Sequence, residues 1–229
     1  MKKKFPNYQL RVLEQNSRDV TFGFGVVLSG RAMTFLAEGD RQLVEKLAAV
    51  TESWSDQHFV HRGECIVIDG SSFSGISRIA MLKILQDACA ELGVEVEYGL
   101  RGGSDLAHDC DVLVGADGAN SLLRDAYADA FGSRVTDLQN YFSWYGVAQP
   151  YSAHTLTFVE TEYGVFCGHH YRYTPTMSTF VPEVDDKTFA RAGMHAMSND
   201  ERQKLTERVF AKVLGDQPLI SNRSSWRRW

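Results

Sequence analysis

The sequence has 229 residues and a net charge of −5, from 29 acidic and 24 basic side chains. Hydrophobic residues make up 44% and charged residues 23%, so the chain can bury a core and general disorder is excluded. The acidic balance argues against a nucleic-acid partner, and no apolar run approaches the roughly 20 residues of a membrane helix. The four cysteines are widely spaced and form no CxxC pair, which is typical of reduced thiols in a cytoplasmic protein.

The first part of the chain has the pattern of an α/β protein. The predicted elements are, in chain order, a strand at 8–14, helices at 31–37 and 41–50, strands at 57–61 and 64–68, a helix at 76–92, strands at 94–98 and 111–115, and a helix at 119–130. The helix at 76–92 is the clearest, because its apolar residues share one face and Gly93 can end it. The apolar run 111–115 suits a buried parallel strand.

After Asp137 the pattern changes to alternating, aromatic-rich strands. They are predicted at 141–147, 155–160, 165–171 and 178–182, which is typical of an antiparallel sheet. A last helix follows, with a capping box from Ser198 to Glu201 and Gly215 at its end. The tail at 225–229 has no predicted element. The fold class is therefore a mixed α/β one, and two domains are expected, at 1–136 and 137–229.

Two glycine-containing segments invite a phosphate-binding interpretation. The run from Gly23 to Leu28 lacks the third glycine of a GxGxxG loop and opens no long helix, so a tight, closely packed turn is favoured. By contrast, the apolar run 111–115 delivers Asp117 and Gly118 to the start of a helix, where sheet edges and helix N-termini hold pyrophosphates. The alternative for this block is an ordinary turn with a capping aspartate.

Two further charged residues are candidates for ligand binding. Glu14 ends a strand, where an acid can bond ribose hydroxyls, although strands often end on a solvated acid. Arg78 lies in the first turn of the clearest helix, which the helix dipole disfavours unless an anion binds there. The alternative is an arginine that extends to water. His58 and His61 point to opposite faces of a strand, so no metal site is expected.

These segments carry a family resemblance. Glu14 at a strand end, the TFGFGVV run at 21–27, the GISR run at 75–78 and the GADG block at 115–118 occur in one order. The sequence resembles the FAD-dependent aromatic hydroxylases of the para-hydroxybenzoate hydroxylase type. It is most similar to the branch of salicylyl-CoA hydroxylase, aminobenzoyl-CoA monooxygenase and the violacein-pathway tryptophan hydroxylase, for which TFGFGVV and GISR are typical.

The resemblance implies an internal piece of such a flavoprotein, truncated at both ends. Family members begin with a strand, a GxGxxG loop and a helix, whereas this sequence starts at what resembles the tail of that helix. Members also carry a later GD-type segment that contacts the flavin, and none occurs before Trp229. The resemblance thus implies an incomplete FAD-binding, Rossmann-like layer over 1–136. A partial substrate-binding domain, an antiparallel sheet with helices, is implied over 137–229.

The implied function is an FAD-dependent monooxygenase that hydroxylates a small aromatic substrate, such as an aryl-CoA thioester or an indole-type compound. In whole members NAD(P)H reduces FAD, and O₂ supplies the oxygen atom that reaches the aromatic ring. The resemblance assigns Glu14 to the adenosine ribose and Arg78 to the surroundings of the flavin and pyrophosphate. It assigns Asp117, Gly118 and Arg124 to the motif that serves the FAD pyrophosphate and the nicotinamide nucleotide.

The antiparallel sheet is expected to roof the aromatic pocket. Strand position makes Phe166, His169 and Tyr171 candidate pocket residues, and no catalytic residue is assigned. Two other functions stay open. One is a non-catalytic remnant or interaction fragment, paired with a complementing chain that supplies the missing segments. The other is an NAD(P)-dependent dehydrogenase, which leaves Asp117 and Arg78 without roles.

Two expectations concern the chain as it stands. Glu14, Arg78 and Asp117 are expected to converge on one face, because the C-terminal ends of parallel strands open toward one crevice. We also expect the chain alone to bind FAD poorly and to leave aromatic compounds unmodified, because a glycine loop normally supplies hydrogen bonds to the pyrophosphate.

Overall fold

The contacts within the chain divide it into two compact units. The computed structural model describes residues 1–228, without the side chain of Ser104. The first unit comprises Met1–Val20 and Gln86–Asp137, and the second comprises Thr21–Leu85 and Leu138–Trp229. The change of unit after Asp137 lies where the sequence pattern changes, but residues 21–85 pack with the second unit. The division into a cofactor domain at 1–136 and a substrate domain at 137–229 stays a prediction.

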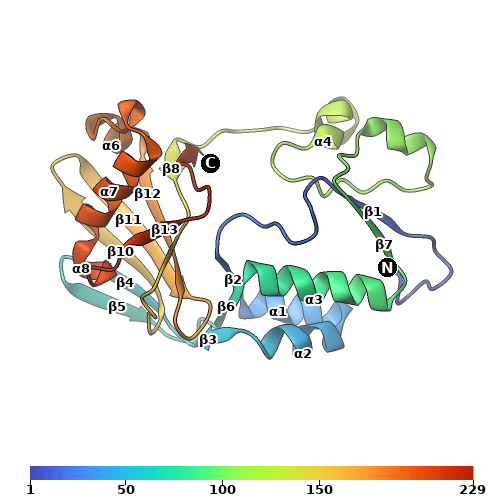
Figure 1. Cartoon of the computed structure of the whole chain (residues 1–229), viewed down its shortest axis with the longest axis horizontal. Coiled ribbons are helices and arrows are strands. Elements are labelled where there is room, and N and C mark those ends of the chain that lie inside the picture. Colours follow the sequence, from blue (N-terminus) through green and yellow to red (C-terminus); the bar gives the residue numbers. More distant parts are fainter. Residues whose placement is uncertain (229) are drawn as a thin grey trace. The chain divides into compact units, whose positions relative to one another are not determined.

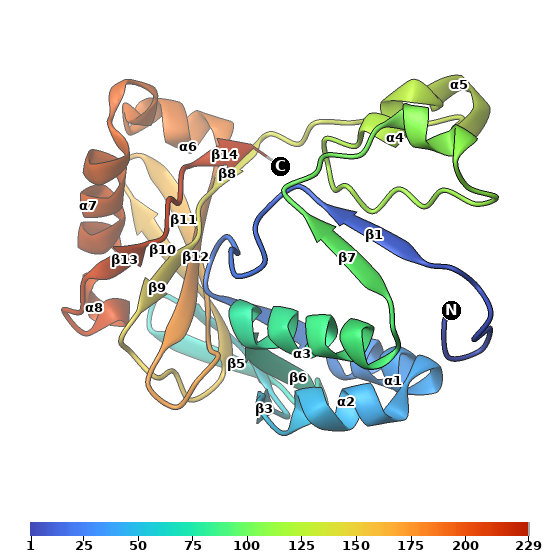
Figure 2. The ribbon, with the colours of Figure 1, turned by 45° about the vertical axis from the view of Figure 1, so that its right-hand side comes forward.

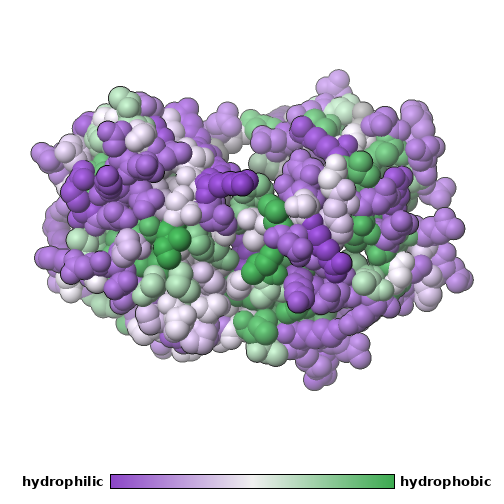
Figure 3. Space-filling model, in the orientation of Figure 1, coloured by the Kyte–Doolittle hydropathy of each residue, from purple (hydrophilic) through white to green (hydrophobic). Residues whose placement is uncertain are grey.

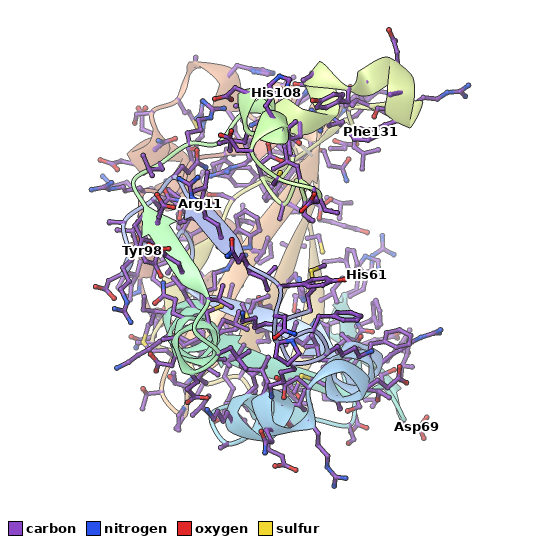
Figure 4. All side chains as sticks on the ribbon, turned by 90° about the vertical axis from the view of Figure 1, so that its right-hand side faces the viewer. Arg11, His61, Asp69, Tyr98, His108 and Phe131 are labelled. Carbon is purple, nitrogen blue, oxygen red and sulfur yellow. The ribbon has the colours of Figure 1, made fainter. Side chains whose placement is uncertain are left out.

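The first unit contains a parallel pair of strands. β1 (Arg11–Glu14) and β7 (Glu95–Tyr98) pair with Arg11 opposite Glu95 and Glu14 opposite Tyr98. Figure 4 shows the labelled Arg11 and Tyr98 on these two neighbouring strands. The guanidinium group of Arg11 also forms an ion pair with the carboxylate of Glu97, which ties the strands together. The strands predicted at 8–14 and 94–98 are thereby confirmed, with slightly shorter bounds.

The strand predicted at 111–115 is wrong. This segment is irregular, and the side chains of Val112 and Val114 are 72% and 69% exposed. A strand is stabilised by hydrogen bonds to a neighbour, and among the described residues the sheet of the first unit contains only β1 and β7. The helix predicted at 119–130 is instead two short helices, α4 (Leu122–Ala126) and α5 (Ala128–Phe131), after a 3₁₀ turn, η1 (Ser104–His108).

The second unit is built on a large sheet, which confirms the mainly antiparallel sheet expected for 141–182. Its strand order is β13-β9-β12-β11-β10-β4-β5, and β8 pairs with β12. The only parallel pair among these described strands is β10 with β4. The bounds are β4 Gln57–His61, β5 Glu64–Ile68, β8 Asn140–Phe142, β9 Tyr145–Val147, β10 His154–Thr161, β11 Gly164–Arg172, β12 Ser178–Asp185 and β13 Leu219–Ser221. Figure 1 shows these strands side by side.

A smaller antiparallel sheet completes the second unit. It has the order β2-β6-β3, with β2 Gly25–Ser29, β3 Glu52–Trp54 and β6 Phe73–Ser77. Two helices, α1 (Gly30–Gly39) and α2 (Arg41–Ala48), connect β2 to β3 and confirm the helices predicted there. Both begin at side-chain caps, because Ser29 accepts a hydrogen bond from the N–H of Ala32 and Asp40 accepts one from the N–H of Leu43.

The structure corrects the start of the clearest predicted helix. α3 covers Arg78–Glu91, and the preceding residues, including the completely buried Ile76, belong to strand β6. Ile76 satisfied the helical spacing of the predicted helix, while the pairing of β6 between β2 and β3 favours an extended backbone at this residue. Arg78 is therefore the first residue of the helix.

Helices cover one face of the large sheet (Figure 2). They are α6 (Asp186–Arg191), α7 (Asn199–Val209) and α8 (Ala211–Leu214), with a 3₁₀ turn, η2 (Met194–Ala196), between the first two. The predicted last helix is thus α7 and α8, and it begins at Ser198 and ends at Gly215 as expected. Phe166, Phe180 and Phe210 are completely buried between helices and sheet and form the centre of the core.

Residues 225–228 of the C-terminal tail are held in place, although no element was predicted for 225–229, and Trp229 lies outside the described residues. Trp226 is 8% exposed and belongs to the core, where its ring lies 5.8 Å from the ring of Phe189. The next residues form β14 (Arg227–Arg228), which pairs with β8. Arg228 also forms an ion pair with Asp186 over 3.0 Å. Long-range pairing, which local sequence does not reveal, therefore fixes this segment.

The surface of the chain is largely hydrophilic, with apolar residues interrupting it in several places (Figure 3). Exposed apolar side chains occur in both units and include Phe22, Ile66, Val112 and Phe131. Within residues 1–228, no helix combines the length and the apolar character needed to cross a membrane.

Replacing Ser198 by alanine is expected to lower the free energy of unfolding by about 1 kcal/mol. The hydroxyl oxygen of Ser198 accepts the N–H of Glu201 over 3.3 Å, and the carboxylate of Glu201 accepts the N–H of Ser198 over 2.7 Å. Urea unfolding followed by circular dichroism measures the change. Replacing the exposed Ser152 by alanine is the matched control and should change stability little. Equal losses in both variants would contradict the capping role.

Candidate functional site

The TFGFGVV segment bends at residues 22–24 and then starts strand β2 at Gly25, so the tight turn favoured for 23–28 is limited to its first residues, whereas the close packing is as expected. Gly25 donates its N–H to the hydroxyl of Thr179 over 2.9 Å and accepts a hydrogen bond from the hydroxyl of Tyr171 over 3.2 Å. A Cβ atom on Gly25 would lie 2.5 Å from the Cβ of Tyr173, so only glycine fits there. Gly23 has φ +77°, and its carbonyl accepts a hydrogen bond from Asn222. This turn is therefore fixed from both sides.

Arg78 lies directly beside this turn. Its backbone N–H donates to the carbonyl of Phe24 over 2.9 Å, and a Cβ atom on Gly23 would lie 3.6 Å from its Nε. The guanidinium carbon is 5.5 Å from the centre of the Trp144 ring, a cation–π distance. The Nε atom is buried and has no hydrogen-bond partner among the described residues. A buried guanidinium N–H without an acceptor is costly, so this atom indicates a place for an acceptor.

A second arginine reaches the same indole. The guanidinium carbon of Arg227, on β14, is 5.8 Å from the centre of the Trp144 ring. Neither Arg78 nor Arg227 forms an ion pair with a carboxylate within residues 1–228. Sequence reasoning missed Trp144 and Arg227, because their proximity depends on the pairing of β8 with β14. The neighbourhood of Arg78 thus carries unbalanced positive charge.

Glu14 is the last residue of β1, and one of its two carboxylate oxygens is hydrogen-bonded. Its Oε1 accepts hydrogen bonds from the backbone N–H and from the side-chain amide of Asn16, both over 2.7 Å. The other oxygen makes no hydrogen bond within the part of the chain that the structure describes. The carboxylate is thereby oriented by Asn16 and retains an acceptor, which suits a hydroxyl-bearing ligand.

The polar side chains in and after the GADG block form hydrogen bonds with residues close to them in the sequence. Asp117 accepts the hydroxyl of Ser121 over 2.6 Å and the N–H of Leu122 over 2.7 Å, and the hydroxyl hydrogen bond holds its pKa below the usual value. Arg124 donates to the carbonyl of Ala119 over 2.5 Å and to the carboxylate of Asp125. Asp117 and Arg124 thus stabilise the start of α4, as in the alternative interpretation of this block as a turn with a capping aspartate.

Gly118 has φ +81°, and a Cβ atom there would meet nothing within 4 Å. The left-handed backbone conformation therefore explains this glycine better than a close approach within the chain. Glu14, Asp117, Gly118 and Arg124 lie in the first unit, whereas Arg78 lies in the second. The expected convergence of Glu14, Arg78 and Asp117 on one face stays a prediction.

The three predicted pocket residues do not share one face of the large sheet. Phe166 is completely buried in the core under the helices, so the structure removes it from any pocket on the other face. His169 and Tyr171 are odd-numbered neighbours on β11 and point to the opposite face, with their rings 5.2 Å apart. Successive side chains of a strand point to opposite faces of the sheet. Even-numbered Phe166 therefore points to the face opposite to that of odd-numbered His169 and Tyr171.

His154 is a polar residue that sequence reasoning missed. It lies on β10, is 3% exposed, and its Nε2 is hydrogen-bonded to the Nε2 of His169. Its ring also lies 4.4 Å from the ring of Phe73 on β6. His154 and His169 are 15 residues apart, a spacing that corresponds to no helix or strand period. The antiparallel pairing of β10 with β11 brings the two rings together.

Burial determines the protonation of these histidines. It lowers the pKa of His154 to about 4 and the pKa of His169 and of His170 to about 3, because the imidazolium form loses its hydration. His170 lies on the core face, where its Nε2 is hydrogen-bonded to the hydroxyl of Thr157. All three rings are therefore neutral at pH 7.

Stability is expected to fall as the pH is lowered from 7.5 to 5.5. The unfolded chain has histidine pKa values near 6.5, so below this pH it binds more protons than the folded chain. The contribution of the neutral histidines to the free energy of unfolding is fully present above about pH 6.5. It is lost progressively as the pH falls from there to the folded-state pKa values of about 4 for His154 and about 3 for His169. Carboxyl groups with lowered pKa, such as Glu201, act at more acidic pH.

Urea unfolding at the two pH values measures this loss. The double variant His154→Phe, His169→Phe should show a smaller difference between the two pH values. The control His108→Gln replaces an exposed histidine (Figure 4) and should retain the full difference. A wild-type chain as stable at pH 5.5 as at pH 7.5 would contradict the buried, neutral state of these rings.

A shallow hollow of about 530 Å³ opens farther along the same strands. Its lining includes Phe158, Cys167, Glu183 and Arg191. Burial raises the pKa of the Cys167 thiol to about 12, so the thiol is protonated at pH 7 and is no nucleophile. Cys167 therefore gives this hollow no nucleophile, although the charged Glu183 and Arg191 line it.

Comparison with known proteins was made on the sequence and on the fold. No family model matches the chain. Salicyloyl-CoA 5-hydroxylase from Streptomyces sp. is 30% identical over 99% of the chain and 46% of its own length. Protodeoxyviolaceinate monooxygenase from Chromobacterium violaceum is 28% identical over 100% of the chain and 62% of its length. A 3-hydroxy-4-methyl-anthranilyl-[aryl-carrier protein] 5-monooxygenase from Streptosporangium sibiricum is 30% identical over 91% of the chain and 55% of its length.

Solved structures share the fold. 2-Methyl-3-hydroxypyridine-5-carboxylic acid oxygenase superposes with a TM-score of 0.71 at 13% identity, over 98% of this chain and 66% of its own. PqsL from Pseudomonas aeruginosa, a probable FAD-dependent monooxygenase, superposes with a TM-score of 0.63 at 15% identity, over 94% of this chain and 67% of its own.

The fold is thus that of the flavoprotein monooxygenases. The sequence comparison identifies a more specific group than the fold does. The chain is a homologue of monooxygenases that act on aromatic compounds, as the resemblance indicated. The chain spans about half the length of the curated relatives that it matches, from 46% to 62%.

Proposed function

We propose that the chain is part of an FAD-dependent monooxygenase that uses NAD(P)H and O₂ to hydroxylate an aromatic substrate. The observation that carries this proposal is the similarity, at 28–30% identity over 91–100% of the chain, to three aromatic-compound monooxygenases. Two of these relatives are named for aromatic acyl groups on coenzyme A or on a carrier protein. An aryl thioester is therefore the substrate class that we propose, and an indole-type compound is the second.

The residues of the chain fit FAD as the cofactor. FAD supplies the redox chemistry when it is bound, and the protein supplies binding and orientation. The buried Nε of Arg78 has no acceptor, and a phosphate or flavin oxygen would provide one. The free carboxylate oxygen of Glu14 can accept a ribose hydroxyl. Asp117 and Arg124 support the turn that presents Gly118, rather than offering free groups of their own.

The substrate side of the proposal rests on the large sheet. Its helix-covered face is filled by the core, so we assign the substrate to the opposite face, where His169 is partly buried and Tyr171 is 3% exposed. Burial raises the pKa of Tyr171 to about 12, and its hydroxyl donates to the carbonyl of Gly25. Tyr171 is thus an uncharged wall residue that also holds the turn beside Arg78.

A chimera tests the proposed function. Residues 1–229 replace the aligned part of the Streptomyces hydroxylase, and the protein is purified and its flavin absorbance measured. We expect bound flavin and NAD(P)H oxidation that an aryl-CoA thioester stimulates. Arg78→Ala should reduce the flavin content, whereas the control Arg62→Ala, on a turn where Arg62 pairs with Glu160, should retain it. A folded chimera without flavin would overturn the proposal.

The chain alone gives a second readout. The 229 residues contain no GxGxxG loop, so we expect no stoichiometric binding at low micromolar FAD in a fluorescence titration. Two or three missing charge-assisted hydrogen bonds, each worth about 1.5–3 kcal/mol, weaken binding by orders of magnitude. Stoichiometric flavin, with NAD(P)H oxidation stimulated by an aromatic compound, would show that these residues suffice by themselves.

A further inference from the structure

The His154–His169 pair lies on the face of the large sheet that the helices leave uncovered. His169 shares this face with Tyr171, and the buried residues Phe166 and His170 alternate with them on β11. The ring of His154 packs on Phe73, and its Nδ1 is buried without a hydrogen-bond partner. The ring of His169 is only partly buried, and its Nδ1 makes no hydrogen bond among the described residues.

The hydrogen bond between the two rings restricts their tautomers. Both rings are neutral at pH 7, so each carries one N–H, and the Nε2–Nε2 contact needs one donor and one acceptor. If His169 donated, the buried Nδ1 of His154 would carry an N–H without a partner. Buried N–H groups without partners are rarer than buried acceptors without partners. The favoured arrangement therefore has His154 donating from Nε2, which leaves the proton of His169 on Nδ1.

We propose that the Nδ1–H of His169 binds an oxygen atom of an aromatic ligand, with the His154 ring fixing its tautomer. The inference rests on the proposed function and deepens it, since it selects aromatic substrates that carry a hydroxyl or carbonyl oxygen. The neighbouring Tyr171 ring, 5.2 Å from the His169 ring and only 3% exposed, is the buried aromatic side chain that lies beside this donor. A neutral imidazole donor favours an acceptor oxygen without demanding a charged ligand.

Nitrogen-15 NMR of the histidine rings tests the tautomers directly in residues 1–229. We expect His154 as the Nε2–H form and His169 as the Nδ1–H form at pH 7. Phenol and toluene, which match in size, then serve as probes. Phenol should shift the Nδ1 resonance of His169 and bind about fivefold more tightly than toluene, the worth of one neutral hydrogen bond.

Variants complete the test. His169→Phe should abolish the preference for phenol, and His154→Phe should weaken it by releasing the tautomer of His169. The control His61→Gln, at the exposed end of β4, should leave the preference unchanged. The proposal is overturned if His169 is the Nε2–H form, if phenol causes no shift, or if both probes bind equally. The flavin content of the chimera is independent of these outcomes, so the two proposals fail separately.

Discussion

Replacing Phe210 by alanine is expected to lower the free energy of unfolding by about 3–5 kcal/mol. The Phe210 side chain is completely buried, and its ring packs edge-on against the ring of Phe180 at 5.0 Å. It also lies over Gly168, where a Cβ atom would come within 2.9 Å of it. The helices and the sheet meet at this ring, so alanine would leave a cavity that neither layer can close.

Urea unfolding of the purified chain measures this change. The matched control is Phe22→Ala, because Phe22 is 52% exposed in the same unit. We expect the control to change the free energy of unfolding by less than about 1 kcal/mol. If the two variants lost similar amounts, Phe210 would not lie in the core.

Replacing Gly75 by alanine is expected to destabilise the second unit by about 1–3 kcal/mol or more. A Cβ atom on Gly75 would lie 2.3 Å from the backbone carbonyl oxygen of Arg172 and 2.8 Å from the Trp54 ring. Gly75 is in the middle strand of the small sheet, so its backbone is held on both sides by β2 and β3. The carbonyl belongs to the end of β11, so one of the two sheets must shift.

The melting temperatures of Gly75→Ala and of the control Gly39→Ala are compared by thermal unfolding. Both variants change backbone entropy, but only Gly75→Ala introduces steric strain. Gly39 is the last residue of α1, and a Cβ atom there would meet nothing within 4 Å. Alanine at that position is expected to leave the melting temperature unchanged or slightly raised. A Gly75→Ala variant that melts with the wild type would contradict the close approach of the two sheets.

The local sequence correctly predicted those elements whose bounds are determined by residues within the element or directly beside it. The hairpin of β4 and β5 was predicted with the observed bounds, because the turn at Arg62-Gly63 separates two short strands. The capping box at Ser198 and the left-handed Gly215 likewise fixed the ends of the last helical region. Such signals act over a few residues, so a single sequence contains them.

Elements that depend on distant partners were not predictable in this way. The apolar run 111–115 has the composition of a strand but forms none, because no described strand pairs with it. Residues 76 and 77 were predicted as the start of a helix but belong to β6, since β2 and β3 pair with this strand on both sides. The tail at 225–229 has no local signal, and burial of Trp226 with the pairing of β14 determines the place of its described residues, 225–228.

The candidate site shows the same division. Sequence motifs found Glu14 and Arg78, and the structure gives each a free acceptor or donor. Motifs did not find Trp144 or His154, because their partners come from strands far along the chain. The strand period of two already separates Phe166 from His169, so this part of the pocket assignment could have been corrected from sequence alone.

β5 forms the last strand at one end of the large sheet, and only β4 pairs with it among the described residues. Ile66, Val67 and Ile68 are 65%, 53% and 46% exposed, so apolar side chains project from both faces of this strand. An open, apolar strand edge is a template on which other extended chains can add. The practical consequence concerns handling, because folded chains are expected to associate through this edge as their concentration rises. A lysine at Val67 would add charge to the edge without entering the core.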